Sequence, residues 1–168
     1  PTAMWNSRLT AGSGSARGMD FKFGKNTGKL TGHIAYSLLW ADRTFAEKNG
    51  GKTFPARFDN RHTINVLLNW QVSDKVQLGA AWTGHSGNRF TLMTQVWDVP
   101  NTGMSSFDDY VPLRTNLNNY RLPFYHRLDL SCTMHNSRGY WTFGLYNAYC
   151  HINTVAIRLS YNDLGQHI

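Results

Sequence analysis

The stretch His62-Thr-Ile-Asn-Val-Leu-Leu-Asn-Trp-Gln-Val72 alternates apolar and polar side chains with a period of two. One parity is wholly apolar and consists of Ile64, Val66, Leu68, Trp70 and Val72. The other parity consists mostly of amide and hydroxyl residues. On a helix these apolar positions would spread around the axis, whereas on a strand they form one face. The stretch therefore predicts a β-strand with one apolar and one polar face.

A second strand of the same kind follows after a short turn. Its apolar parity consists of Val76, Leu78, Ala80 and Trp82. A turn of three residues would pair Val72 with Val76 and Trp70 with Leu78, and the two apolar faces would then lie on the same side. We therefore predict an antiparallel hairpin over about residues 60–87.

The segment before it, about residues 16–41, has the same construction. Apolar residues alternate on both sides of the polar string at 24–29. A two-residue turn at 26–27 pairs Phe23 with Leu30 and aligns the apolar faces. This segment predicts a further hairpin.

A third hairpin is predicted over about residues 123–150. Alternating apolar residues again flank a short polar stretch. A two-residue turn at 137–138 pairs Met134 with Trp141 and places the apolar residues of both strands on one side.

Short turns thus alternate with long connections at about 43–58 and 88–121. Strands of about ten residues, with short turns at one end and long loops at the other, are typical of transmembrane β-barrels. Tryptophans close to both ends of the strands fit two interfacial girdles, namely Trp40, Trp82, Trp70 and Trp141. A soluble β-sandwich or small barrel also alternates, but such long loops are unusual there. We predict an all-β fold: an antiparallel transmembrane β-barrel segment of six to seven strands, forming one partial domain over residues 1–168.

The composition excludes some classes of protein. The 168 residues include 17 Lys and Arg against 10 Asp and Glu, a formal net charge of +7. No apolar run reaches the roughly eighteen residues of a transmembrane helix. The basic residues are scattered near turns rather than gathered on one element, which argues against nucleic acid as a partner. The charge fits anionic surroundings such as lipopolysaccharide, or an unbalanced piece of a larger protein.

Two short strings, and the number of histidines, suggest catalytic or metal motifs but lack the required context. The His-Arg-Leu-Asp string at 126–129 has no accompanying Gly-rich loop, strand lysine or Asp-Phe-Gly. The Gly-His-Ser-Gly-Asn string at 84–88 follows a strand and lacks the last glycine of a nucleophile elbow. The seven histidines do not form a metal-ligand pattern. We predict no enzymatic activity, no metal site and no cofactor.

Three longer strings resemble one family. Phe-Pro-Ala-Arg-Phe-Asp-Asn-Arg-His at 54–62, Asn-Asn-Tyr-Arg-Leu-Pro-Phe-Tyr-His-Arg-Leu-Asp-Leu-Ser at 118–131 and Leu-Tyr-Asn-Ala-Tyr-Cys-His-Ile-Asn at 145–153 occur in order. They resemble the C-terminal barrel region of TonB-dependent outer-membrane receptors, of the type with a carboxypeptidase-like regulatory domain. The resemblance covers about residues 15–161. Asn153-Thr154 departs from it, since Asn-Pro is usual there.

The resemblance implies part of a 22-stranded plugged barrel in the bacterial outer membrane. It implies import of a scarce solute such as an iron chelate, vitamin, peptide or glycan. The implied partners are outer-membrane lipid and lipopolysaccharide, the remaining strands and plug of the same receptor, a TonB-type energy-coupling complex and a surface lipoprotein. We expect this chain to be a fragment without the plug. The alternative function is a soluble β-sandwich or small-barrel module that binds carbohydrate.

Candidate ligand-binding residues fall into two sets. Aromatic and hydrogen-bonding side chains in the long connections are the kind that bind a solute: Trp97, Tyr110, Arg114, Asn119 and Tyr120. Polar side chains on the face opposite the apolar one are expected to face the barrel lumen: Asn65, Asn69, Gln71, Arg127, Asp129, Thr142 and Tyr146. The plainer alternatives are packing within an extracellular loop and a hydrated barrel wall.

Overall fold

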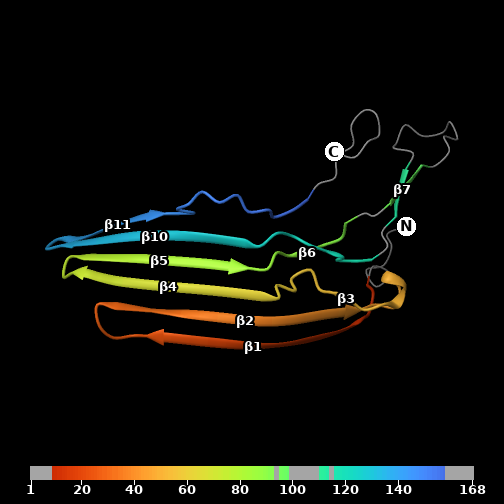
Figure 1. Cartoon of the computed structure of the whole chain (residues 1–168), viewed down its shortest axis with the longest axis horizontal. Coiled ribbons are helices and arrows are strands. Elements are labelled where there is room, and N and C mark those ends of the chain that lie inside the picture. The colour runs from red at the N-terminus through yellow and green to blue at the C-terminus, as the bar shows by residue number, and fades with distance from the viewer. Residues whose placement is uncertain (1–8, 93–94, 99–109, 114–115, 158–168) are drawn as a thin grey trace. The chain divides into compact units, whose positions relative to one another are not determined.

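The computed structural model describes residues 9–92, 95–98, 110–113 and 116–157 (Figure 1). These residues form strands and one short 3₁₀ turn, η2 (Asn49–Gly51). The long strands are β1 (Ser13–Lys25), β2 (Leu30–Thr44), β4 (His62–Ser73), β5 (Val76–His85), β10 (Tyr125–Asn136) and β11 (Gly139–Leu145). The short strands are β3 (Phe54–Pro55), β6 (Arg89–Phe90), β7 (Gln95–Asp98), β8 (Tyr110–Leu113) and β9 (Tyr120–Arg121).

The long strands make one antiparallel sheet in the order β1-β2-β4-β5-β10-β11, and β3 pairs with β2 (Figure 1). Two small sheets, β6-β9 and β7-β8, lie within the long connection that follows β5. The all-β, antiparallel part of the predicted fold is therefore confirmed. The sheet does not close on itself within the described residues. No helix among these residues is long and apolar enough to cross a membrane.

The described chain falls into two compact units. One takes residues from Pro1–Arg17, Trp40–Asp59 and Asn88–Arg121, and the other from Gly18–Leu39, Asn60–Gly87 and Leu122–Ile168. We call them the connection unit and the sheet unit. The sheet unit holds β4, β5, β10, β11 and the turn-proximal parts of β1 and β2.

The β10–β11 register matches the prediction. Met134 lies opposite Trp141 and Cys132 opposite Phe143, across a turn at 137–138. In the β4–β5 pair, the register matches the prediction from Trp70 onward, away from the turn, where Trp70 lies opposite Leu78.

The predicted pairing of Val72 with Val76 is wrong, because Ser73 takes that place. The turn has two residues, 74 and 75, and the register shifts between Gln71 and Ser73. A β-bulge at Val72 absorbs the residue that we assigned to the turn.

The predicted two-residue turn between β1 and β2 is also wrong. The strands end at Lys25 and restart at Leu30, so the connection spans four residues. An added Cβ at Gly24 would lie 3.3 Å from both the Gly32 carbonyl oxygen and His33 Cβ, so Gly24 lies level with residues 32 and 33. In agreement with this, Phe21 stacks on Tyr36, with ring centroids 6.4 Å apart. Phe23 is therefore not opposite Leu30. The displacement is even in residue number, so the apolar faces still coincide.

The sheet unit has two chemically different faces. One face carries large apolar side chains that are 37% to 79% exposed: Met19, Phe21, Phe23, Leu30, Ile34, Leu68, Trp70, Leu78, Leu130, Met134, Trp141, Phe143 and Leu145. The register of neighbouring strands places these residues side by side across β2, β4, β5, β10 and β11, and Phe21 of the adjacent β1 stacks on Tyr36 of β2. The other face carries the polar parity. The sheet has no covering layer on its apolar face among the described residues.

Few described side chains are buried. The buried hydrophobic residues are Phe54, Ala56 and Leu122, and Asp59 is the buried charged residue.

The sequence did not predict β3 or the strand pairs inside the connection at 88–121, because strands of two to four residues are too short to show a period. The possible seventh strand among the predicted six to seven is the sequence Val-Ala-Ile-Arg-Leu-Ser-Tyr at 155–161. Residues 155–157 have no strand, and residues 158–161 lie outside the described part of the chain.

Candidate functional site

A network of charged and phenolic side chains lies on the polar face of β10. The Arg127 guanidinium donates from Nε and Nη2 to Asp129 Oδ2, at 3.0 and 2.8 Å. Its Nη1 donates to Tyr125 Oη at 3.3 Å and also to Tyr146 Oη. The guanidinium carbon lies 4.0 Å from the centre of the Tyr146 ring. The sequence places both side chains on one face of the strand, and the structure pairs them on that face.

The network ties the end of β11 to β10. Asp129 Oδ1 accepts the backbone N–H of Asn147 at 3.0 Å, so both carboxylate oxygens are occupied. Asn147 itself has a positive φ of 52°, and its side chain donates to the His151 carbonyl and accepts the His151 N–H. The Arg127 and Asp129 side chains are still 27% and 28% exposed. Such a cluster offers fixed donors and acceptors to a polar solute or to ordered water.

The remaining polar-face candidates make mainly short cross-strand contacts. Thr83 donates to the Asn65 side chain at 3.0 Å, and the Thr133 and Thr142 hydroxyls are 3.0 Å apart. Gln71 donates to the Ser73 carbonyl at 2.8 Å, and so belongs to the bulge.

Asn69 lies between Thr31 and Gly79 of the neighbouring strands. The seven polar-face candidates are thus spread over three strands and the residue after β11. Arg127, Asp129 and Tyr146 are the three that the structure brings together.

The loop candidates are only partly described. Trp97 lies on β7 opposite Val111, and Tyr110 lies on β8 opposite Asp98. Arg114 lies outside the described residues.

Asn119 and Tyr120 come at the start of β9. The Asn119 side chain accepts the N–H of Leu92 at 2.9 Å and donates to the Leu92 carbonyl at 3.3 Å. Its amide therefore holds the connection together, a structural use typical of asparagine in loops. Tyr120 is 39% exposed and remains accessible.

The connection unit contains a buried ion cluster that the sequence did not predict. Asp59 is fully buried, and Arg121 reaches it twice. Arg121 Nη1 donates to the Asp59 carbonyl at 2.6 Å, and Nη2 donates to Oδ2 at 3.0 Å. Arg89 Nε lies 3.8 Å from the same Oδ2. Residues 59, 89 and 121 are far apart in sequence, so no periodicity could have joined them.

In the same unit a second asparagine side chain, besides that of Asn119, hydrogen-bonds to the backbone of a distant segment. Asn118, with a φ of 52°, donates from its side chain to the Pro55 carbonyl at 2.8 Å. The Thr91 hydroxyl accepts the Asn118 N–H at 3.0 Å. These contacts and the Asp59 cluster fix strand β3 against the β6–β9 pair.

Aromatic and imidazole side chains gather on the apolar face, around β10. His126 Nδ1 lies 2.7 Å from Tyr149 Oη, and the His126 ring stacks on His151 with centroids 3.9 Å apart. The Trp82 ring also stacks on the His126 ring, with centroids 6.5 Å apart. His126 thus lies on the face opposite Arg127 and Asp129, as its parity predicts.

A second pair belongs to the same band. Tyr36 Oη lies 2.8 Å from His62 Nδ1, and their rings stack at 6.1 Å. Side chains with an apolar body and a polar tip suit a boundary between an apolar and an aqueous phase. Parity in the sequence predicts Trp82 and His126 at this level, but not their contacts with Tyr149 and His151 or the Tyr36–His62 pair.

Within the described part of the chain, no group of three or more His, Cys, Asp or Glu side chains could hold a metal ion. Cys132 and Cys150 are both free. The His126, Arg127 and Asp129 side chains do not share a site, because the first lies on the opposite face of β10 from the other two.

Comparison with protein-family models, with curated proteins and with solved structures found no match to this chain. Any assignment of function to this chain therefore rests on its own geometry.

Proposed function

We propose that this chain forms part of the wall of an outer-membrane transporter of the TonB-dependent type, which imports a scarce solute. The observation that carries the proposal is the apolar face of the sheet unit, which is exposed across six strands. Monomeric soluble proteins rarely leave such a continuous apolar surface open to water. The acyl chains of a lipid bilayer would cover this apolar surface without the free-energy cost of exposing it to water.

The pattern of the two faces supports the proposal. A barrel wall alternates lipid-facing apolar residues with polar residues that face the lumen. The described sheet does this along β4, β5, β10 and β11. The aromatic and imidazole band around His126 then takes the place of an interfacial girdle.

The strand connections also support it. The turns at 26–29, 74–75 and 137–138 are short, whereas the connections at 45–61 and 86–124 are long. Outer-membrane barrels have short periplasmic turns and long extracellular loops. The proposal therefore assigns the three short turns to the periplasmic side.

The edges of the sheet imply further strands. β1 and β11 each have one neighbour among the described strands. An open edge is not tolerated in the hydrocarbon region, because its backbone N–H and C=O groups would be unsatisfied. We propose that the remaining strands, and a plug, come from the rest of the same receptor, and that a TonB-type complex and a surface lipoprotein act on the assembled protein.

Within this proposal, two groups of residues contact the solute or the plug. The Arg127–Asp129–Tyr146 network supplies fixed polar groups on the lumenal face. Tyr120 supplies an exposed aromatic ring in a long extracellular connection. The solute classes that fit are polar ones that accept hydrogen bonds, such as a chelate or a glycan.

The test is fractionation of cells that produce the full-length protein containing this chain. We expect it in outer membranes and expect extraction to need detergent. A monodisperse protein in the soluble fraction would contradict the proposal, and would favour the alternative of a soluble carbohydrate-binding module.

A further inference from the structure

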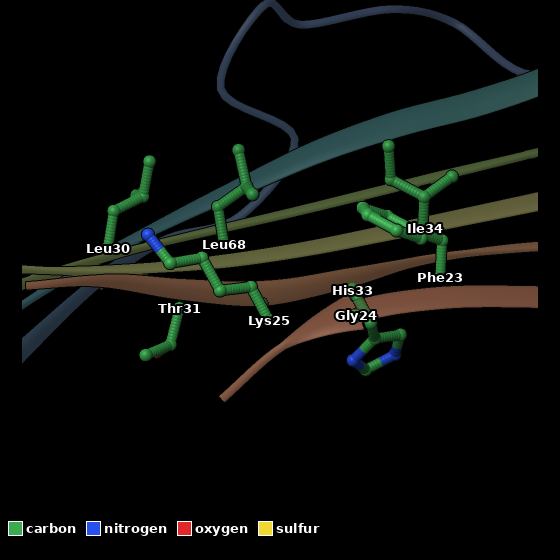
Figure 2. Close-up of a pocket in the computed structure, with 9 residues that line it drawn as sticks. Phe23, Gly24, Lys25, Leu30, Thr31, His33, Ile34 and Leu68 are labelled. Carbon is green, nitrogen blue, oxygen red and sulfur yellow. The ribbon is translucent and has the colours of Figure 1, made fainter. Parts of the chain in front are cut away.

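A hollow of about 140 Å³ interrupts the apolar face near the short turn between β1 and β2 (Figure 2). Its apolar walls are Phe23, Leu30, Ile34 and Leu68. Figure 2 shows these four side chains on one side of the strands, while Thr31 and His33 point to the other side. All of the lining residues belong to the sheet unit.

Gly32 makes the hollow. It lies between Leu30 and Ile34 on the same parity and opposite Leu68 of β4, so a side chain is missing from the centre of the apolar surface. Its φ is 152°, and an added Cβ would lie 2.1 Å from the Leu67 carbonyl oxygen. Larger residues therefore do not fit here, and the hollow is a fixed feature of this backbone.

One cation stands at the rim. Lys25 shares the parity of Phe23, and Figure 2 shows its side chain on the same side of the strands as Leu30 and Leu68. An added Cβ at Gly28 of the turn would lie 3.7 Å from Lys25 Nζ, so the ammonium group reaches the level of the turn. No carboxylate of the described residues forms an ion pair with Lys25.

We propose that this hollow is a binding site for one glycerophospholipid, with an acyl segment in the hollow and its anionic phosphodiester on Lys25. This inference rests on the proposed function, which places the short turns and Lys25 at the periplasmic interface. A water molecule's share of liquid volume is about 30 Å³ and a methylene group is of similar size, so roughly five methylene groups fit. Lysines next to a lipid face reach toward the interface and attract anionic headgroups.

The chain offers a matched control for the cation. Lys22 lies on the same strand, but its parity places it on the polar face. Lys25→Ala and Lys22→Ala therefore remove the same charge on opposite sides of β1. For the walls, Leu68→Ala opens the hollow, whereas Met134→Ala removes an equally exposed apolar side chain outside it.

The experiment is native mass spectrometry of the full-length protein in detergent, titrated with dioleoylphosphatidylglycerol or with dioleoylglycerol, which lacks the phosphate. We expect Lys25→Ala to weaken binding of the tightest phosphatidylglycerol about fivefold, and Lys22→Ala to leave it unchanged. Leu68→Ala should also weaken it, and Met134→Ala should not. Dioleoylglycerol should bind equally to the wild type and Lys25→Ala.

Equal phosphatidylglycerol retention by Lys25→Ala and Lys22→Ala would overturn the inference, as would a loss in Lys25→Ala that Leu68→Ala does not share. If the protein nevertheless needs detergent and fractionates with outer membranes, either of these outcomes leaves the proposed function intact. A protein that is monodisperse without detergent overturns the proposed function, and this inference with it.

Discussion

At the scale of single residues, Arg127 and Asp129 show that alternation along a strand predicts the face on which a side chain lies. Their spacing of two on a strand predicted that both lie on one face, and the 2.8 Å contact between them confirms it. Tyr146 was also expected on this face, but its contact with Arg127 depends on how the chain turns after β11, which no period encodes. The Asp59 cluster was unpredictable for the same reason, since its members come from two long connections that no period describes.

The Asp129 carboxylate should fix the backbone after β11. We expect Asp129→Ala to speed amide hydrogen exchange at Asn147, because the substitution removes the acceptor of that N–H. Ser131→Ala, two residues further along the same face, is the control and should leave exchange at Asn147 unchanged. Unaltered exchange at Asn147 in Asp129→Ala would show that the network does not hold this segment.

The Asp59 cluster should stabilise the connection unit. Asp59→Ala leaves Arg121 and Arg89 without their shared carboxylate, and we expect a loss of about 3 kcal/mol in the free energy of unfolding, measured by urea titration. Asp74→Ala in the exposed β4–β5 turn should cost less than about 0.5 kcal/mol. Similar losses in both variants would speak against a stabilising role for the buried pair.

At the scale of strands and hairpins, alternation predicted which segments are strands and which face is apolar. It predicted the register of β10–β11, and that of β4–β5 except at Val72, where a bulge next to the turn displaces one residue. It did not predict the register of β1–β2, where the connection has four residues, because an apolar/polar pattern of period two allows any even shift. Backbone features that need a particular φ, such as Gly32, are not visible in that pattern.

Gly32 provides a test at this scale. An alanine there would combine a φ of 152° with a Cβ 2.1 Å from the Leu67 carbonyl oxygen, so we expect Gly32→Ala to lower the free energy of unfolding by about 2 kcal/mol. Gly144→Ala on β11 is the matched control, because nothing lies within 4 Å of its added Cβ. The comparison is made by urea unfolding, and equal stability of the two variants would refute the strained geometry at Gly32.

At the scale of the whole molecule, the sequence and the structure agree on an antiparallel sheet with one exposed apolar face. The candidate site was predictable on the polar face of the sheet, where parity sorts the residues, and much less so in the long connections. There Asn119 was predicted as a ligand contact, whereas its amide is bonded to the Leu92 backbone. Membrane insertion is the part of the proposal on which the roles of all these residues depend.

A charge on the apolar face should therefore be costly in a membrane. We expect Leu130→Arg to lower the free energy of unfolding in lipid vesicles by about 3 kcal/mol, the cost of an arginine near the bilayer midplane. Ser131→Arg places the same side chain on the polar face and should cost less than about 1 kcal/mol. Equal costs would indicate that the two faces of β10 meet the same solvent.

The most direct measurement is a scan of nitroxide labels along β10 in the full-length protein, reconstituted in vesicles after Cys132 and Cys150 are replaced by alanine. Labels at Leu128, Leu130 and Met134 should collide with oxygen dissolved in the lipid, and labels at Ser131, Thr133 and His135 with a water-soluble nickel complex. This alternation with a period of two is what a transmembrane barrel wall predicts. Labels at 128, 130 and 134 that are shielded from both reagents, as in a packed protein core, would contradict it.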